Sequence, residues 1–121
     1  MKLEFVVEKD CDEIMREVYD VEDIGEVEKI LDEVKDKIMK LSDKVAFEPG
    51  KEGQTVLVKM FKDGKVVGVY RSQIASKRCA DILTEYEEAR EAFWKDFAWI
   101  SRIYFAKRFE EVVKDEVGGS D

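Results

Sequence analysis

Acidic side chains are the most abundant groups in this chain that could do chemistry, and many of them are adjacent. The 121 residues include 29 Asp and Glu, and nothing distinguishes a pair such as Glu87-Glu88 from the others. Acid–base catalysis needs two groups held in contrasting environments, which solvated helix faces do not provide. Histidine, the commonest general base, is absent. We therefore expect no catalytic residues and no enzymatic activity.

The sequence predicts no metal and no cofactor. The run Asp10-Cys11-Asp12-Glu13 lacks the glycine and the distal glutamate of a calcium loop. Phosphate-loop, dinucleotide-binding and nucleophile-elbow patterns do not occur. Cys11 and Cys79 are too far apart in sequence for a C-x-x-C pair. We interpret both as small buried hydrophobic residues, and a disulfide between them is the alternative.

A basic segment is the first candidate binding site. Between Gln54 and Ala80 six Lys and Arg residues accompany a single acid, Asp63. Cations close to the free amides of a helix N-terminus suit phosphate, so the segment is a candidate nucleic-acid site. The alternative is that its lysines protect an edge hairpin from self-pairing. The candidate residues are Lys59, Lys62, Lys65, Arg71, Ser72, Lys77 and Arg78.

An aromatic segment from Phe93 to Phe109 is the second candidate, and it contains both tryptophans. Apolar residues at steps of three and four predict a helix, but here they extend nearly all the way round it. The excess apolar surface fits the monomer core, a second subunit or a ligand groove. Aromatic residues and arginine are enriched at protein interfaces. The candidate partner-binding residues are Trp94, Trp99, Arg102, Tyr104, Phe105 and Phe109.

Composition narrows the class of protein. The formal net charge is −8, which opposes a protein that coats nucleic acid or an anionic membrane. Charged residues make up 41% of the chain, and thermolabile asparagine is absent, as is typical of hyperthermophiles. Charges within the aromatic segment exclude a transmembrane span. The opening Met1–Phe5 alternates instead of forming a signal peptide, so we expect a cytoplasmic protein from a thermophilic source.

Apolar spacing predicts the elements that hold these residues. Alternation indicates a strand over Lys2–Glu8, whereas residues 10–19 are compatible with a short helix or a strand. Asp23 begins a helix through Leu41, and Glu33 and Lys37 are spaced for an ion pair on it. Residues 44–48 are predicted to form a short strand.

The strongest local signal is Asp63-Gly64, which suits a two-residue type I′ turn between strands 54–62 and 65–71. Counting from this turn pairs Phe61 with Val66 and Val58 with Val69. Ser72 is then the expected N-cap of a helical region that extends to Val117. Because one helix of that length would exceed the width of such a domain, we expect a break near residues 80–84.

Together these elements predict an α+β fold, an antiparallel sheet of about four strands with helices packed on one face and a long aromatic-rich C-terminal helix. Residues 1–117 would form a single domain and 118–121 a disordered tail. We expect a non-enzymatic protein-interaction module that forms a homodimer through the Phe93–Phe109 helix. A nucleic-acid-binding accessory protein using residues 59–78 is the alternative. A small enzyme or ligand carrier lined by Tyr70, Trp94 and Tyr104 is a third hypothesis.

Overall fold

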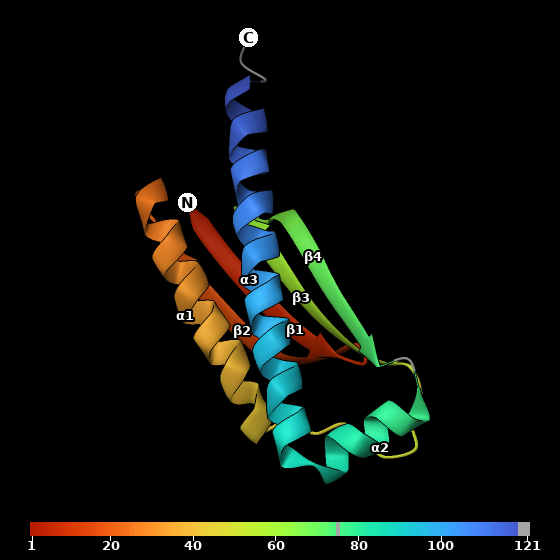
Figure 1. The fold of residues 1–121 in the computed structure, drawn as a ribbon. Coiled ribbons are helices and arrows are strands. Elements are labelled where there is room, and N and C mark those ends of the chain that lie inside the picture. The colour runs from red at the N-terminus through yellow and green to blue at the C-terminus, as the bar shows by residue number, and fades with distance from the viewer. Residues whose placement is uncertain (75, 119–121) are drawn as a thin grey trace.

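The computed structural model describes residues 1–74 and 76–118 and has an α+β fold, as the sequence predicts (Figure 1). Four antiparallel strands lie in the order β2-β1-β3-β4. They are β1 (Lys2–Lys9), β2 (Asp12–Asp20), β3 (Gln54–Lys62) and β4 (Lys65–Ile74). The helices are α1 (Val27–Met39), α2 (Lys77–Glu85) and α3 (Glu87–Gly118), and short 3-10 turns over Ile24–Glu26 and Lys40–Asp43 flank α1.

The core lies between the sheet and the two long helices. Helices α1 and α3 run side by side across one face of the sheet (Figure 1). Alternate residues of the central strands point toward them, because side chains in a strand alternate between faces. Leu3 and Phe5 of β1 and Val58 and Met60 of β3 are fully buried there. On the same face, Phe105 of α3 packs edge-on against Phe5 with ring centroids 6.3 Å apart.

The structure resolves the ambiguity at residues 10–19 and differs from the prediction at residues 44–48. Residues 10–19, which suited a helix or a strand, form β2 and the two-residue turn before it. The predicted strand over residues 44–48 is wrong, because this segment is irregular. Side chains, and not a neighbouring strand, form hydrogen bonds with its backbone. Gln54 accepts from the Glu48 amide, Trp94 donates to the Val45 carbonyl, and Thr84 donates to the Phe47 carbonyl.

The β3–β4 hairpin forms at Asp63-Gly64, where φ is 50° and 81°. Phe61 pairs with Val66 as predicted, but the register then shifts, and Met60 pairs with Gly68. The predicted Val58–Val69 pair is therefore wrong: Val58 pairs with Tyr70, and Val69 lies on the open face. The bulge places Gly68 beneath Tyr104, where an added Cβ would lie only 2.9 Å from the Tyr104 hydroxyl oxygen.

The helical region begins later than predicted and breaks once. Ser72 belongs to β4, and Ser76 is the N-cap of α2, accepting a hydrogen bond from the Cys79 amide at 3.2 Å. The expected break occurs at Tyr86, which is extended, two residues beyond the predicted range. Helix α3 continues to Gly118, and residues 119–121 of the predicted tail lie outside the described residues. None of the helices in the described ranges has the length and apolarity needed to cross a membrane.

Candidate protein-interaction surface

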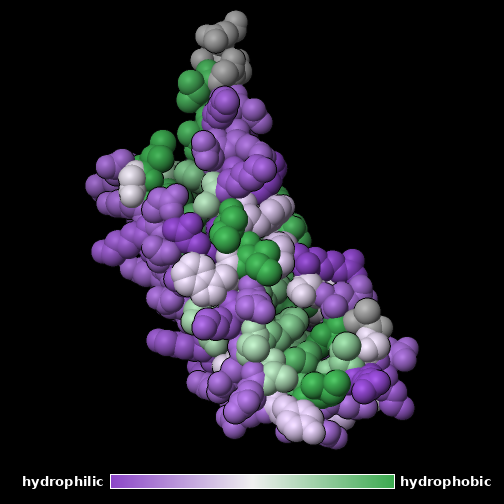
Figure 2. All heavy atoms as spheres, in the orientation of Figure 1, coloured by the Kyte–Doolittle hydropathy of each residue, from purple (hydrophilic) through white to green (hydrophobic). Residues whose placement is uncertain are grey.

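Helix α3 has two contrasting faces along its middle turns. Trp94, Phe97 and Phe105 are buried against the sheet and the segment before β3. Ile103 follows Trp94 by nine residues, or two and a half turns at about 3.6 residues per turn, and therefore points the opposite way. Large apolar side chains remain exposed on that outward side: Trp99 by 44%, Ile100 by 50% and Ile103 by 63%. Figure 2 shows hydrophobic residues along this outward side among mostly polar neighbours.

The structure divides the predicted partner-binding residues between the core and the surface. Trp94, Phe105 and Phe109 are buried within the chain. The Trp94 ring stacks on Phe47, and its Nε1 donates to the Val45 carbonyl at 3.3 Å. Because these aromatic residues hold the monomer together, they position α3 instead of presenting themselves to a partner.

Arg102 and Tyr104 are half-buried and already engaged within the chain. Arg102 donates to Asp32 at 2.9 Å and to Glu28 at 2.7 Å, joining α3 to α1. The hydrogen bond from Arg102 lowers the pKa of Asp32, and the bond to Asp32 raises the pKa of Arg102. Tyr104 packs on Tyr70 with ring centroids 5.7 Å apart.

Trp99 is the predicted partner-binding residue that the structure leaves exposed. It lies at the seam between α3 and α1, where the Lys35 ammonium sits 3.9 Å from its ring centroid. This cation–π contact fixes the indole while leaving much of its surface accessible. Trp99 therefore forms one flank of the outward face.

Four residues form the outward stripe of α3: Asp96, Ile100, Ile103 and Lys107, at intervals of four, three and four. All four are exposed. The sequence places Ile100 on the apolar side of the helix, but it cannot show that the sheet and α1 occupy the other side. The helical spacing does show that Ile103 lies half a turn from Trp94, so the two side chains cannot both face the same core.

An apolar groove of about 260 Å³ lies beside the outward stripe, between α1 and α3. Its walls include Val27, Leu31, Ala106 and Phe109, with Glu28 and Glu110 among its polar lining. A second hollow, of about 400 Å³, is lined by Asp10, Cys11, Lys51, Thr55, Leu57 and Arg71. The residues of the ligand-carrier hypothesis, Tyr70, Trp94 and Tyr104, line neither.

The predicted basic site is divided among β3, β4 and α2. Lys62 pairs with Glu116 at 2.8 Å, near the hairpin end, and Lys59 pairs with Glu8 at 2.6 Å. Lys65 and Arg71 are exposed on β4 and lie six residues apart, or about 20 Å at about 3.3 Å per residue. Lys77 and Arg78 lie beyond its end on α2, and Ser72 lies within the strand.

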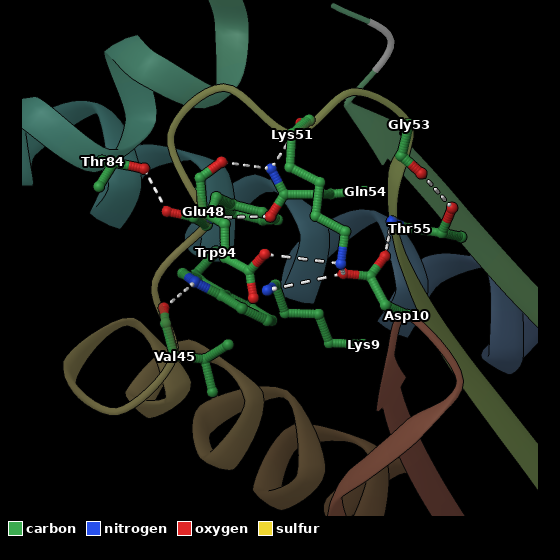
Figure 3. Close-up of polar contacts among 11 residues, drawn as sticks. Lys9, Asp10, Val45, Glu48, Lys51, Gly53, Gln54, Thr55, Thr84 and Trp94 are labelled. Carbon is green, nitrogen blue, oxygen red and sulfur yellow. Dashed lines mark hydrogen bonds and ion pairs between the residues drawn. The ribbon is translucent and has the colours of Figure 1, made fainter. Parts of the chain in front are cut away.

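Figure 3 shows a polar cluster around the segment before β3, and this cluster is structural. Gln54 is fully buried, accepts from the Glu48 amide and donates to the carbonyls of Glu48 and Lys51. Asp10 accepts from the Thr55 amide at 2.9 Å and pairs with Lys51. These bonds tie the segment before β3 to Gln54 and to the β1–β2 turn.

Cys11 and Cys79 are both exposed and free, so their predicted burial and the alternative disulfide are wrong. Cys11 occupies a tight turn with φ of 73°, and Cys79 lies in the first turn of α2. Groups of three or more His, Cys, Asp or Glu suited to a metal ion do not occur among residues 1–74 and 76–118.

Comparisons with models of protein families, with curated proteins and with solved structures found no match to this chain.

Proposed function

We propose that this protein is a non-enzymatic interaction module that forms a homodimer through the outward face of α3. One observation carries the proposal: Trp99, Ile100 and Ile103 are exposed together on a helix whose opposite side is anchored in the core. Monomeric proteins seldom present contiguous large apolar residues without a binding role. The opposite side of the helix is buried in the core, so the helix is ordered before binding and its surface loses little freedom on association.

The energetic gain from covering this face is substantial. Full burial of one isoleucine side chain contributes about 1.5–3 kcal/mol, and the two isoleucines here are half exposed or more. In a symmetric dimer each residue contributes twice, once from each copy. Trp99 at the flank adds an aromatic residue of the kind that is enriched at interface centres.

Nucleic-acid binding ranks second because the basic residues are separated and partly neutralised. Glu8 and Glu116 offset Lys59 and Lys62. Nucleic-acid affinity comes largely from cations that neutralise phosphates, and paired lysines must first leave their carboxylates.

We place the protein in the cytoplasm of a thermophilic organism. Two exposed free cysteines suit a reducing compartment. A composition of 41% charged residues, with ion pairs that join β1 to β2 and α1 to α3, suits a high working temperature.

The test is the oligomeric state of Ile103→Asp compared with the unaltered protein, measured by sedimentation equilibrium over a wide concentration range. We expect the unaltered protein to dimerise and Ile103→Asp to weaken dimerisation at least about a hundredfold, since a buried unpaired carboxylate opposes association strongly. Because Ile103 is exposed in the monomer, the variant and the unaltered protein should unfold at the same denaturant concentration when both are diluted below the dimer dissociation constant.

Ile82→Asp is the matched control, because Ile82 is an exposed isoleucine on a different helix, α2. This variant should dimerise like the unaltered protein. A chain that remains monomeric at every concentration would overturn the proposed function. Equal dimerisation of Ile103→Asp and the unaltered protein would show that the contact lies elsewhere.

A further inference from the structure

We infer, on the basis of the proposed homodimer, that the second copy docks with its α3 antiparallel and places its Lys107 opposite Asp96. The intervals between successive residues of the outward stripe are four, three and four, from Asp96 to Lys107, and this series is the same in either direction along the helix. A two-fold axis through the midpoint between Ile100 and Ile103 superimposes the stripe on itself.

This symmetry gives a specific pairing across the interface. Ile100 of each copy meets Ile103 of the other, which forms an apolar centre with two equivalent contacts. Asp96 meets Lys107 of the other copy on both sides of that centre. The two charged residues are about 16 Å apart along the helix at 1.5 Å per residue, so the two ion pairs bracket the isoleucines. The interval pattern matches the seam of a left-handed helix pair.

The charges of the stripe are available for this role. Some charged residues of α3 form ion pairs within the chain: Arg90 pairs with Glu87, Arg102 with Glu28, and Arg108 with Glu111. In the described ranges, neither Asp96 nor Lys107 forms an ion pair. Both are exposed and lie one turn from an exposed isoleucine.

The alternative orientation of the helices is electrostatically unfavourable. A parallel copy in register would set Asp96 against Asp96 and Lys107 against Lys107. Like charges directly opposed at an interface disfavour association, whereas the antiparallel copy satisfies both pairs. The antiparallel orientation is therefore favoured both by the pairing of opposite charges and by the symmetric spacing of the stripe.

The experiment exchanges the two charges and mixes the variants. Asp96→Lys and Lys107→Asp each turn both attractive pairs into repulsive ones, so each variant alone should dimerise at least about tenfold more weakly. Asp96→Lys/Lys107→Asp restores attraction and should return the dissociation constant to within about threefold of the unaltered value. An equimolar mixture of the two single variants should form a heterodimer, because one copy then carries two lysines and the other two aspartates.

Sedimentation equilibrium at low salt and near 1 M salt measures each species, and salt should reduce the differences because it screens the pairs. Lys29→Asp and Glu33→Lys on the exposed side of α1 are matched charge controls and should leave dimerisation unchanged. If the unaltered protein dimerises but neither the double variant nor the mixture recovers affinity, the antiparallel pairing is overturned and the homodimer stands. If the unaltered protein is monomeric, both are overturned.

Discussion

Asp10 connects the β1–β2 turn to the first residues of β3 through one carboxylate. Its Oδ1 accepts from the Thr55 amide at 2.9 Å, and its Oδ2 lies 3.4 Å from the Lys51 ammonium. Burial alone would raise the pKa of Asp10, but the Thr55 hydrogen bond and Lys51 outweigh it, and the pKa is lowered. A carboxyl whose pKa is lowered on folding stabilises the protein above its unfolded pKa of about 3.9, and this stability is lost as pH falls through the lower folded value.

Asp10→Asn should therefore change stability in a pH-dependent way. At pH 7 the loss of charge should lower the unfolding free energy by about 0.5–1 kcal/mol. Asn tolerates the φ of 50° at this position, so any backbone contribution of the substitution should be the same at every pH. Urea denaturation at pH 7 and pH 3 measures the difference from the unaltered protein, which should shift in favour of the variant at pH 3. Asp12→Asn, an exposed neighbour, is the control. A difference that is the same at both pH values would contradict the argument.

At the scale of elements, the segment from Val45 to Gly53 depends on Gln54 for its conformation. The buried amide of Gln54 makes three hydrogen bonds to the backbone of Glu48 and Lys51. We expect Gln54→Ala to cost about 2–4 kcal/mol of unfolding free energy, because it leaves buried backbone groups unpaired. Hydrogen exchange should show the Glu48 amide losing protection, while Gln73→Ala, the exposed glutamine of β4, changes neither property. Unaltered stability of Gln54→Ala would show that water replaces the side chain.

The elements that the sequence predicts well are those decided by neighbouring residues. Asp63-Gly64 specifies its turn locally, and the β3–β4 hairpin forms there. The bulge that follows is not specified by neighbouring residues: it sets Gly68 opposite Met60 and against Tyr104 of a distant helix, which the turn sequence does not encode. Lys37 likewise pairs with Glu17 of β2 at 2.8 Å instead of the predicted Glu33, because the fold brings that strand beneath α1.

For the molecule as a whole, the sequence indicates that α3 has more apolar residues than one face requires. It does not show which of them are buried in the core and which are exposed to solvent. Trp94 and Trp99 look alike as candidates, yet Trp94 is fully buried and Trp99 is 44% exposed. Their separation requires knowing that both the sheet and α1 pack on α3. The candidate surface is therefore only partly predictable: the sequence identifies Trp99 as a site residue but does not single out Ile103.

The distribution of charge over the molecule leads to a prediction about nucleic acid. With a net charge of −8 and with Lys59 and Lys62 paired to glutamates, mixed-sequence single- and double-stranded DNA and RNA should not bind at physiological salt. Fluorescence anisotropy of labelled oligonucleotides at low and physiological salt measures this. Lys62→Glu with Arg71→Glu is the informative variant, because it removes one paired and one exposed cation from β3 and β4.

Weak binding confined to low salt, and unchanged by this double substitution, would reflect nonspecific attraction to scattered lysines. Micromolar binding that falls steeply with salt and is lost in the double variant would contradict the prediction. Such a result would assign function to the hairpin, since releasing counterions from several phosphates requires cations that act together. It would also require Lys59 and Lys62 to leave Glu8 and Glu116 on binding, so replacing each glutamate by glutamine should then strengthen the complex. The distribution of the basic residues over β3, β4 and α2, and the pairing of Lys59 and Lys62 with glutamates, are the physical reasons to expect the opposite outcome.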